Sequence, residues 1–387
     1  MVSSTVTAGN TATKPGTEQT GNKNVAVRPF TKSSLLHDEP IAYDVSTALG
    51  ASVVRLPDIE IPASGYLRAV VLYVSTSGGS GTSVTMGENG PFNVLSDIIL
   101  QEPNGSQIAY WEDGYYLAMT DKYGGFFGRG NDPRSSYNYS TAVDSDAEFT
   151  FCLRIPVETI MRDALTSLPN QNMAAKYRIK LNLNTVGNVF GTDPSTPPTV
   201  RVRALLEGWE QPLEVVDGVP QATMPPLVNS TQFHTMQTIT VGAAGQQQFP
   251  LTRLGNRIRQ LTFVFVDGGD STRATSDGDF PDPLTISLDN RPILVIPRYL
   301  WLERLSWYYG ARAMNGAVAA AAETAGGRDY GVWPLPFNQE FLGAAGQELG
   351  DLWLKTLTTS RLEISGNFLG TGSLKVITND IALTGEL

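Results

Sequence analysis

Cysteine and histidine, the side chains most often used as nucleophiles, general bases and zinc ligands, are scarce in this chain. Its 387 residues include one cysteine, Cys152, and two histidines, His37 and His234. This set is too small for the usual tetrahedral zinc site made of protein ligands. No motif links either histidine to the thiol, and Cys152 lies between Phe151 and Leu153. We therefore predict that Cys152 is a buried, small hydrophobic side chain and not a nucleophile.

Carboxylates are the next candidates for chemistry. Glu112 and Asp113 are adjacent, and neighbouring side chains on a strand point to opposite faces, so this pair cannot flank one glycosidic bond. We interpret it as loop charge. Asp267–Asp270 and Asp277–Asp279 could hold calcium, but they lack the ligand spacing of a calcium loop, which favours solvated loops. Phosphate-loop, metalloprotease and serine-hydrolase motifs are also missing from the sequence, so we predict no catalytic, metal or cofactor site and no enzyme.

A group of aromatic side chains lies in the segment RYLWLERLSWYYG. The group consists of Tyr299, Trp301, Trp307, Tyr308 and Tyr309. Such rings could stack on a sugar or a base, but helical spacing favours packing at the end of a sandwich or contact with another subunit. We therefore predict inter-subunit contacts at these five residues. The Ala-rich segment Ala311–Ala325 could pack against another chain as a helix, or form an exposed loop helix.

The overall charge argues against a nucleic-acid groove. The net charge is −10 and the pI is about 4.8. Because a polyanion is bound by clustered Lys and Arg, and the sequence has no such run, we expect no direct sequence-specific contact with nucleic acid. The N-terminus has no basic region followed by an apolar stretch, and no apolar run reaches the ~18 residues that span a bilayer. We expect synthesis in a cytoplasm.

Length and composition favour two β-rich domains. Hydrophobic residues make up 41% and charged residues 17%, with 38 Gly and 24 Pro, a balance typical of short strands joined by many turns. Residues 211–229 carry four prolines and break every period, which is typical of a linker. The expected organisation is an N-terminal arm at 1–40, a first domain at 41–210, the linker at 211–229 and a second domain at 230–387.

The same series of elements occurs in both predicted domains. LRAVVLYV from Leu67 aligns with IRQLTFVF from Ile258, an offset of 191. SDIILQEPNGSQIAYW and TISLDNRPILVIP each predict a hairpin. FCLRIPVETI then aligns with GVWPLPFNQEF, which places Pro156 against Pro336. Matched elements in the same order indicate a duplication.

About eight antiparallel strands per copy, with long central loops, are typical of a jelly roll. We therefore predict an all-β chain of two tandem eight-stranded jelly rolls with short helices in loops. Helical turns are expected at Glu158–Leu165 and Glu340–Leu349, and a short amphipathic helix within RYLWLERLSWYYG. The long insertions Phe126–Ala147 and Ala311–Asp329 occupy equivalent positions, so we expect them at the same end of their jelly rolls.

The succession GYLRAVVLYV, PFNVLSDIILQEPNGSQIAYWEDGYYLAM, YGG and FCLRIPVETI resembles the major capsid proteins of tectiviruses and related icosahedral phages with an internal membrane. The resemblance covers about residues 45–387. It is carried by the order of features, the duplication and the length.

The resemblance implies two jelly rolls per subunit, perpendicular to the capsid surface, and three subunits per pseudo-hexagonal capsomer. We accordingly expect a major capsid protein that forms the icosahedral shell of a virion as homotrimers. Its partners would be further copies of itself, penton and minor capsid proteins, and an internal membrane touched by the N-terminal arm.

Two other classes of protein are compatible with the pattern. A viral spike or carbohydrate-binding β-sandwich protein is one alternative, and a glycoside-active jelly-roll enzyme is the other. Either would normally concentrate aromatic and acidic residues in the loops of one copy. Because both copies keep the same plan, the sequence favours a lattice role.

Overall fold

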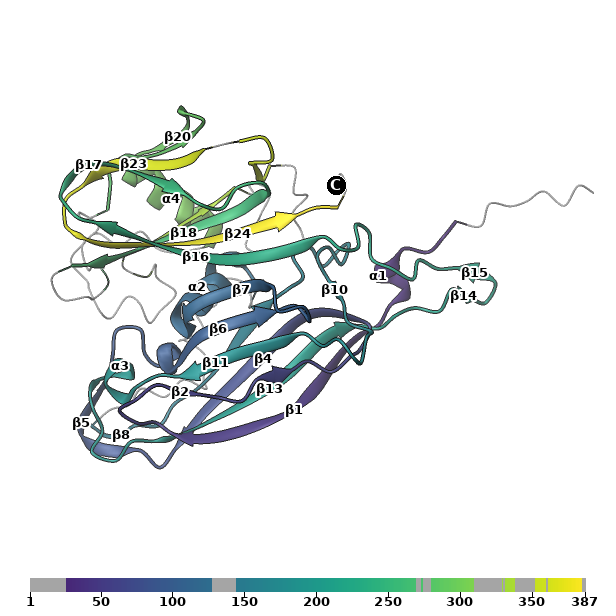
Figure 1. Cartoon of the computed structure of the whole chain (residues 1–387), viewed down its shortest axis with the longest axis horizontal. Coiled ribbons are helices and arrows are strands. Elements are labelled where there is room, and N and C mark those ends of the chain that lie inside the picture. The colour runs from purple at the N-terminus through teal and green to yellow at the C-terminus, as the bar shows by residue number, and fades with distance from the viewer. Residues whose placement is uncertain are drawn as a thin grey trace, which may run out of the picture.

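A computed structural model describes residues 26–126, 144–268, 273, 280–309, 329, 331–337, 352–359 and 361–384, without the side chains of 144–146 and 306–309. Strands dominate these residues and form two sandwiches, one above the other in Figure 1. We call the sandwich built from residues 36–209 the first sandwich, and the one built from residues 231–382 the second.

The first sandwich encloses its core between two antiparallel sheets. One sheet runs from β1 (Leu36–Ala48) through β13 (Thr199–Trp209) to β4 (Tyr66–Ser77), whose far edge pairs with β9 (Thr150–Pro156) and β10 (Leu168–Pro169). The facing sheet consists of β2 (Val54–Arg55) and β3 (Ile59–Glu60), then β11 (Arg178–Leu183), β6 (Leu95–Gln101) and β7 (Gln107–Asp113). A small additional sheet contains β12 (Phe190–Thr192), β5 (Ser80–Met86) and β8 (Asp144–Asp146).

The second sandwich has the same construction. One sheet runs through β16 (Thr231–Val241), β24 (Gly372–Ala382), β18 (Arg257–Asp267) and β21 (Val332–Pro336), with β22 (Leu354–Lys355) also pairing β18. The facing sheet runs through β17 (Gly245–Leu251), β23 (Leu362–Phe368), β19 (Leu284–Leu288) and β20 (Arg291–Ile296).

Both sandwiches follow one strand plan. If β2 and β3 count as one interrupted strand and the short accessory strands are left aside, each has eight strands. In chain order, one sheet takes the first, eighth, third and sixth strands, and the other takes the second, seventh, fourth and fifth. The register repeats as well, because Pro156 pairs with Ala69 and Pro336 pairs with Gln260, at the offset of 191 expected for β4 and β18. The predicted pair of eight-stranded jelly rolls is confirmed.

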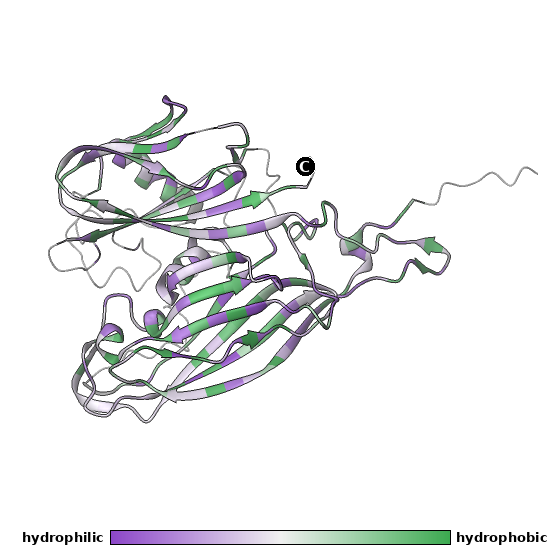
Figure 2. Ribbon diagram, viewed as in Figure 1, coloured by the Kyte–Doolittle hydropathy of each residue, from purple (hydrophilic) through white to green (hydrophobic). Residues whose placement is uncertain are grey.

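Alternation of apolar and polar residues explains why these segments form strands. In β13, Val200, Val202 and Leu206 are buried in the core, while Arg201 points to the other face. Figure 2 shows the same alternation along the strands of the first sandwich. Each such burial contributes about 1.5–3 kcal/mol, so the period-2 pattern determines which face of each strand turns inward.

Two helices follow equivalent hairpins. The first, α2 (Gly114–Gly124), follows β7 and is capped by Gly125, whose φ of 70° suits a residue without a Cβ. The second, α4 (Arg298–Tyr309), follows β20, and burial of Trp301 and Leu305 confirms the predicted amphipathic helix. Shorter helical turns are α1 (Phe30–Ser33), η1 (Phe92–Val94) and α3 (Val186–Val189).

The helical turn predicted at Glu158–Leu165 is wrong. The segment forms a tight loop closed by a bridge between Ile160 and Leu165. The Thr166 hydroxyl donates to the Val157 carbonyl at 2.7 Å and accepts from the Thr159 backbone N–H at 2.9 Å. Such side-chain bonds compete with helical ones. The helix predicted at Glu340–Leu349 lies outside the described residues.

The arm predicted at residues 1–40 needs correction at its end, because β1 begins at Leu36 and, just before it, Phe30 and Ser34 are buried. Phe30 of α1 is buried against Tyr66 and Trp209, with ring centroids 5.2 and 6.0 Å away. An aromatic anchor of this kind fixes a segment that lacks apolar periodicity. Residues 1–25 and most of both insertions lie outside the described residues, so the common end expected for the insertions stays a prediction.

Candidate assembly surfaces

The two sandwiches meet where β7, the fifth strand of the first, lies parallel to β16, the first strand of the second. Ala109 bridges to His234 there, so one ten-stranded sheet runs from β2 to β21. Helix α2 lies between the sandwiches (Figure 1), and all of its residues are buried. We call this contact the junction. It is head-to-tail, since it joins different edges of two similar bodies.

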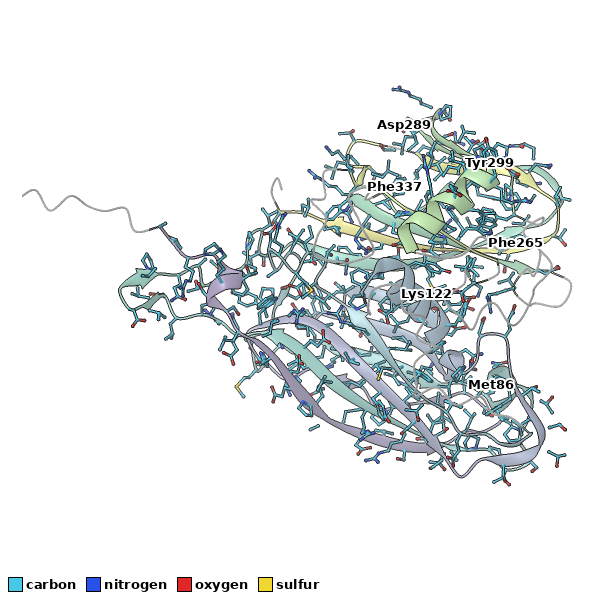
Figure 3. The ribbon with its side chains drawn as sticks, turned by 180° about the vertical axis from the view of Figure 1, so that it is seen from behind. Met86, Lys122, Phe265, Asp289, Tyr299 and Phe337 are labelled. Carbon is cyan, nitrogen blue, oxygen red and sulfur yellow. The ribbon has the colours of Figure 1, made fainter. Side chains whose placement is uncertain are left out.

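A buried ion pair crosses the junction. The Lys122 ammonium on α2 lies 2.7 Å from the Asp329 carboxylate, and the Tyr123 hydroxyl donates to the same oxygen at 2.8 Å. The Lys122 side chain is 8% exposed and that of Asp329 is fully buried. Figure 3 shows Lys122 between the two sandwiches. Because both charges have left water, each depends on the other for stabilisation.

His234 lies in the apolar centre of the junction. Its ring centroid is 5.1 Å from that of Trp111 and 5.9 Å from that of Phe126, and the side chain is fully buried. Neither ring nitrogen has a hydrogen-bond partner among the described residues. Burial, and next the positive charge of Arg259, lower the pKa of His234 to about 3. The folded protein therefore holds this imidazole neutral.

Acid should weaken the junction through His234. The group binds a proton below about pH 6.5 when unfolded but only near pH 3 when folded. Its contribution to stability is therefore complete above the unfolded pKa and falls as pH drops through this window. At about 1.4 kcal/mol per pH unit, wild type should lose about 2 kcal/mol between pH 6.5 and pH 5 relative to His234→Leu, measured by denaturant unfolding.

The control for this experiment is His37→Gln, which changes the other histidine, outside the junction. That variant should keep the acid sensitivity of wild type. Equal pH dependence in wild type and His234→Leu would contradict the assignment.

Glu112 and Asp113 lie in β7, which corrects their interpretation as loop charge. Asp113 caps α2, since its carboxylate accepts hydrogen bonds from the N–H groups of Tyr115 at 2.8 Å and Tyr116 at 3.3 Å. Burial raises the pKa of Asp113 to about 7 in spite of these bonds. Glu112 pairs with Lys375 of β24 across the junction. The two carboxylates therefore serve helix capping and the junction.

A polar cleft of about 680 Å³ opens beside these carboxylates. Its lining includes four acidic and two basic side chains, Glu88, Asp97, Glu112, Asp113, Arg273 and Lys375. Arg273 donates from its backbone N–H to the Glu88 carboxylate at 2.6 Å and from its guanidinium to Asn89 at 3.0 Å. Within the described residues no three His, Cys, Asp or Glu are grouped as metal ligands. We interpret the cleft as a charged seam between the sandwiches. Of the acidic segments considered for calcium and interpreted as solvated loops, only Asp267 and Gly268 lie within the described residues.

Cys152 is half-buried on β9, less buried than predicted, because it points to the outer face of its sheet while Phe151 and Leu153 fill the core. Burial raises the pKa of its thiol. A raised pKa disfavours the thiolate that a nucleophile requires.

The structure separates the aromatic residues predicted to touch other subunits. Trp301 is 2% exposed in the second core, and its indole N–H donates to the Pro334 carbonyl at 2.8 Å. Its predicted role in inter-subunit contact is therefore wrong, because Trp301 lies on the buried face of α4 and points into the core. Tyr299 is 75% exposed, and its contact role stays a prediction. The side chains of Trp307, Tyr308 and Tyr309 lie outside what the structure describes.

No protein-family model and no curated protein matches the sequence. Solved structures match nearly all of it. The major capsid protein of Sulfolobus turreted icosahedral virus has a TM-score of 0.60 at 11% identity, over 90% of this chain and 97% of that one. Major capsid protein P2 of bacteriophage PM2 has a TM-score of 0.51 at 9% identity, over 91% and 98%. The capsid of PBCV-1 virus gives 0.53 at 11% identity, over 90% and 93%.

The chain has the double jelly-roll fold. At these identities the likeness concerns the fold, and it spans both sandwiches, because more than nine-tenths of each neighbour is covered.

Two of the sheet edges that pair with no described segment lie at opposite ends of the double jelly roll. In Figure 1, β1 lies at the bottom of the first sandwich and β20 at the top of the second, with the junction between them. Ile293 and Val295 of β20 are 40% and 53% exposed. An exposed apolar edge strand normally marks a place where another chain pairs or packs.

A second exposed apolar group lies on the segment between the sandwiches. A hairpin of β14 (Val215–Val216) and β15 (Val219–Pro220) projects from the body beside α1 (Figure 1). Leu213, Val215 and Met224 are exposed around it. None of the described helices is long and apolar enough to cross a bilayer.

Proposed function

We propose that the protein is the major capsid protein of an icosahedral virus and builds the shell as pseudo-hexameric homotrimers. The observation that carries the proposal is the head-to-tail junction of two jelly rolls with one strand plan. Three solved double jelly rolls described as capsid proteins or capsids, from three different viruses, match over 90% or more of the chain and support the proposal.

Geometry connects the junction to a trimer. A head-to-tail contact leaves one unused edge of each kind on every chain, and such contacts form a ring when the rotation closes. Three chains supply six similar jelly rolls, which fill a hexagonal position in a lattice. The chain itself is therefore its principal partner, first in the trimer and then in the capsid.

A protein that forms the shell would also contact other components of the virion. We propose contacts with penton and minor capsid proteins, and contact of the N-terminal arm with an internal membrane. The exposed apolar hairpin β14–β15 lies beside the first described residues, and this supports a contact with other components at that end of the subunit. The proposed location is the virion, after synthesis in the host cytoplasm, and no catalytic role is proposed.

Abundance in purified particles tests this function against a spike. A shell protein must cover the particle, so this chain should be the dominant protein by stained gel or quantitative mass spectrometry. A penton protein, present at few positions, serves as the internal reference. The capsid proposal fails if this chain is a minor component, whereas that result would suit a spike.

A further inference from the structure

Three side chains of the second sandwich pack into the core of the first. They are Val264, Val332 and Ile377, none more than 3% exposed. They lie on the outer face of the sheet that contains β18, because their neighbours Phe263 and Phe265 point into the second core. This outer face is where the second jelly roll docks on the first.

The internal repeat gives each of these side chains a counterpart in the first sandwich. Tyr73 of β4 is equivalent to Val264 at the offset of 191. Tyr73 pairs with Cys152 as Val264 pairs with Val332, and Val71 pairs with Leu205 as Thr262 pairs with Ile377. The equivalent pairs are therefore Val264 and Tyr73, Val332 and Cys152, Ile377 and Leu205, and Thr262 and Val71.

The counterparts are only half-buried and lie on the outer face of the first sandwich. We call Val71, Tyr73, Cys152 and Leu205 the receiving face. A hollow of about 570 Å³, lined by Ser75 and Arg201 among others, adjoins it. The positions that are fully buried at the junction therefore keep part of their surface accessible at the far end of the chain.

Arg203 adds an independent observation. It is equivalent to Lys375, because Arg203 pairs with Tyr73 as Lys375 pairs with Val264. Lys375 forms an ion pair with Glu112 of the other sandwich. The Nε of Arg203 is buried without a hydrogen-bond partner among the described residues, although the guanidinium lies over the Tyr73 ring at 4.5 Å. An acceptor from another chain would satisfy this donor.

The matching surface lies at the other end of the molecule. In the first sandwich β7 and α2 form the side of the junction that the second sandwich covers. Their equivalents are β20 and α4, where Ile293, Val295 and Tyr299 are exposed. We call these three residues the docking edge. Figure 3 shows Tyr299 on the side of the second sandwich that faces away from the first.

We propose that the docking edge of one copy packs on the receiving face of a second copy, repeating between chains the contact that joins the two sandwiches within a chain. The inference rests on the proposed trimer and assigns its interface. Both surfaces are apolar, they occupy opposite ends of the chain, and a ring of three copies covers all of them.

Two charge insertions in the full-length protein test the assignment by sedimentation velocity. Val295→Lys changes the docking edge and Leu205→Lys changes the receiving face, where it adds a second positive charge beside Arg203, and each should weaken self-association about tenfold or more by burying an unpaired charge. The matched control is Met173→Lys, which changes an 81% exposed methionine outside both surfaces. Unfolding midpoints should stay near wild type, since neither altered side chain is buried in a core.

The Cys152 thiol gives a second readout. It lies on the receiving face, so a thiol reagent should label it more slowly in wild type than in Val295→Lys, although Val295 is on the other sandwich. If wild type is a trimer but both variants stay trimeric and Cys152 reacts equally fast, this interface is wrong and the proposed function stands. A monomeric wild type overturns the proposed trimer and this interface together.

Discussion

Replacing Asp329 with alanine should lower the free energy of unfolding by about 3–5 kcal/mol, measured by denaturant unfolding. The carboxylate accepts from the Lys122 ammonium at 2.7 Å and from the Tyr123 hydroxyl at 2.8 Å, and no part of its side chain is exposed. Its loss leaves the Lys122 charge buried at the junction without this partner. The effect is large because the desolvation of that charge is no longer offset by this carboxylate.

Two further variants separate this cause from general damage. Lys122→Met with Asp329→Leu removes both charges and should regain most of the lost stability, because an apolar pair has no desolvation cost. Asp44→Ala breaks an ion pair with Arg201 in which both side chains are 48% exposed, and should change the free energy of unfolding far less than Asp329→Ala does, because solvent screens this pair. A similar small loss for Asp329→Ala would show that the junction does not depend on this pair.

The fold was largely predictable because the two copies of the duplication share apolar strand sequences that can be aligned with each other. Aligning Leu67 with Ile258 and Pro156 with Pro336 anticipated the observed pairs Ala69 with Pro156 and Gln260 with Pro336. Strands buried on one or both faces have a strong pattern, and a slip by one residue would turn the apolar set outward.

The missed elements have weaker signals. The strand β1 contains Pro40, and four of its first five residues are exposed, so its start resembles a polar arm. The strand β5, SGTSVTM, has only Val84 buried and gives almost no alternation. The loop after β9 was mistaken for a helix because Thr159 and Thr166 bond to the backbone locally, which propensity does not reveal.

The assembly surfaces were harder to predict than the fold. The aromatic segment was correctly placed on a helix, but the sequence did not show that Trp301 points into the core while Tyr299 points out. The junction residues were missed entirely. A charged Lys122 inside the apolar run YYLAMTDKYGG and a His234 in a strand were the available signals, and both need the partner sandwich to be interpreted.

The trimer should resist salt. High salt screens exposed ion pairs, with a screening length of about 10 Å already at 0.1 M, but it does not weaken apolar burial. The receiving face and the docking edge are mainly apolar, and an obligate interface of this kind is expected to bury on the order of 2,000–5,000 Å². Self-association should therefore be nearly the same at low and high salt.

Mass measurement of the purified full-length protein tests the central claim most directly. Native mass spectrometry at low salt and sedimentation at low and high salt should both give a species of three times the chain mass of 41.8 kDa. A stable monomer of 41.8 kDa under both conditions would contradict the capsomer and, with it, the proposed function.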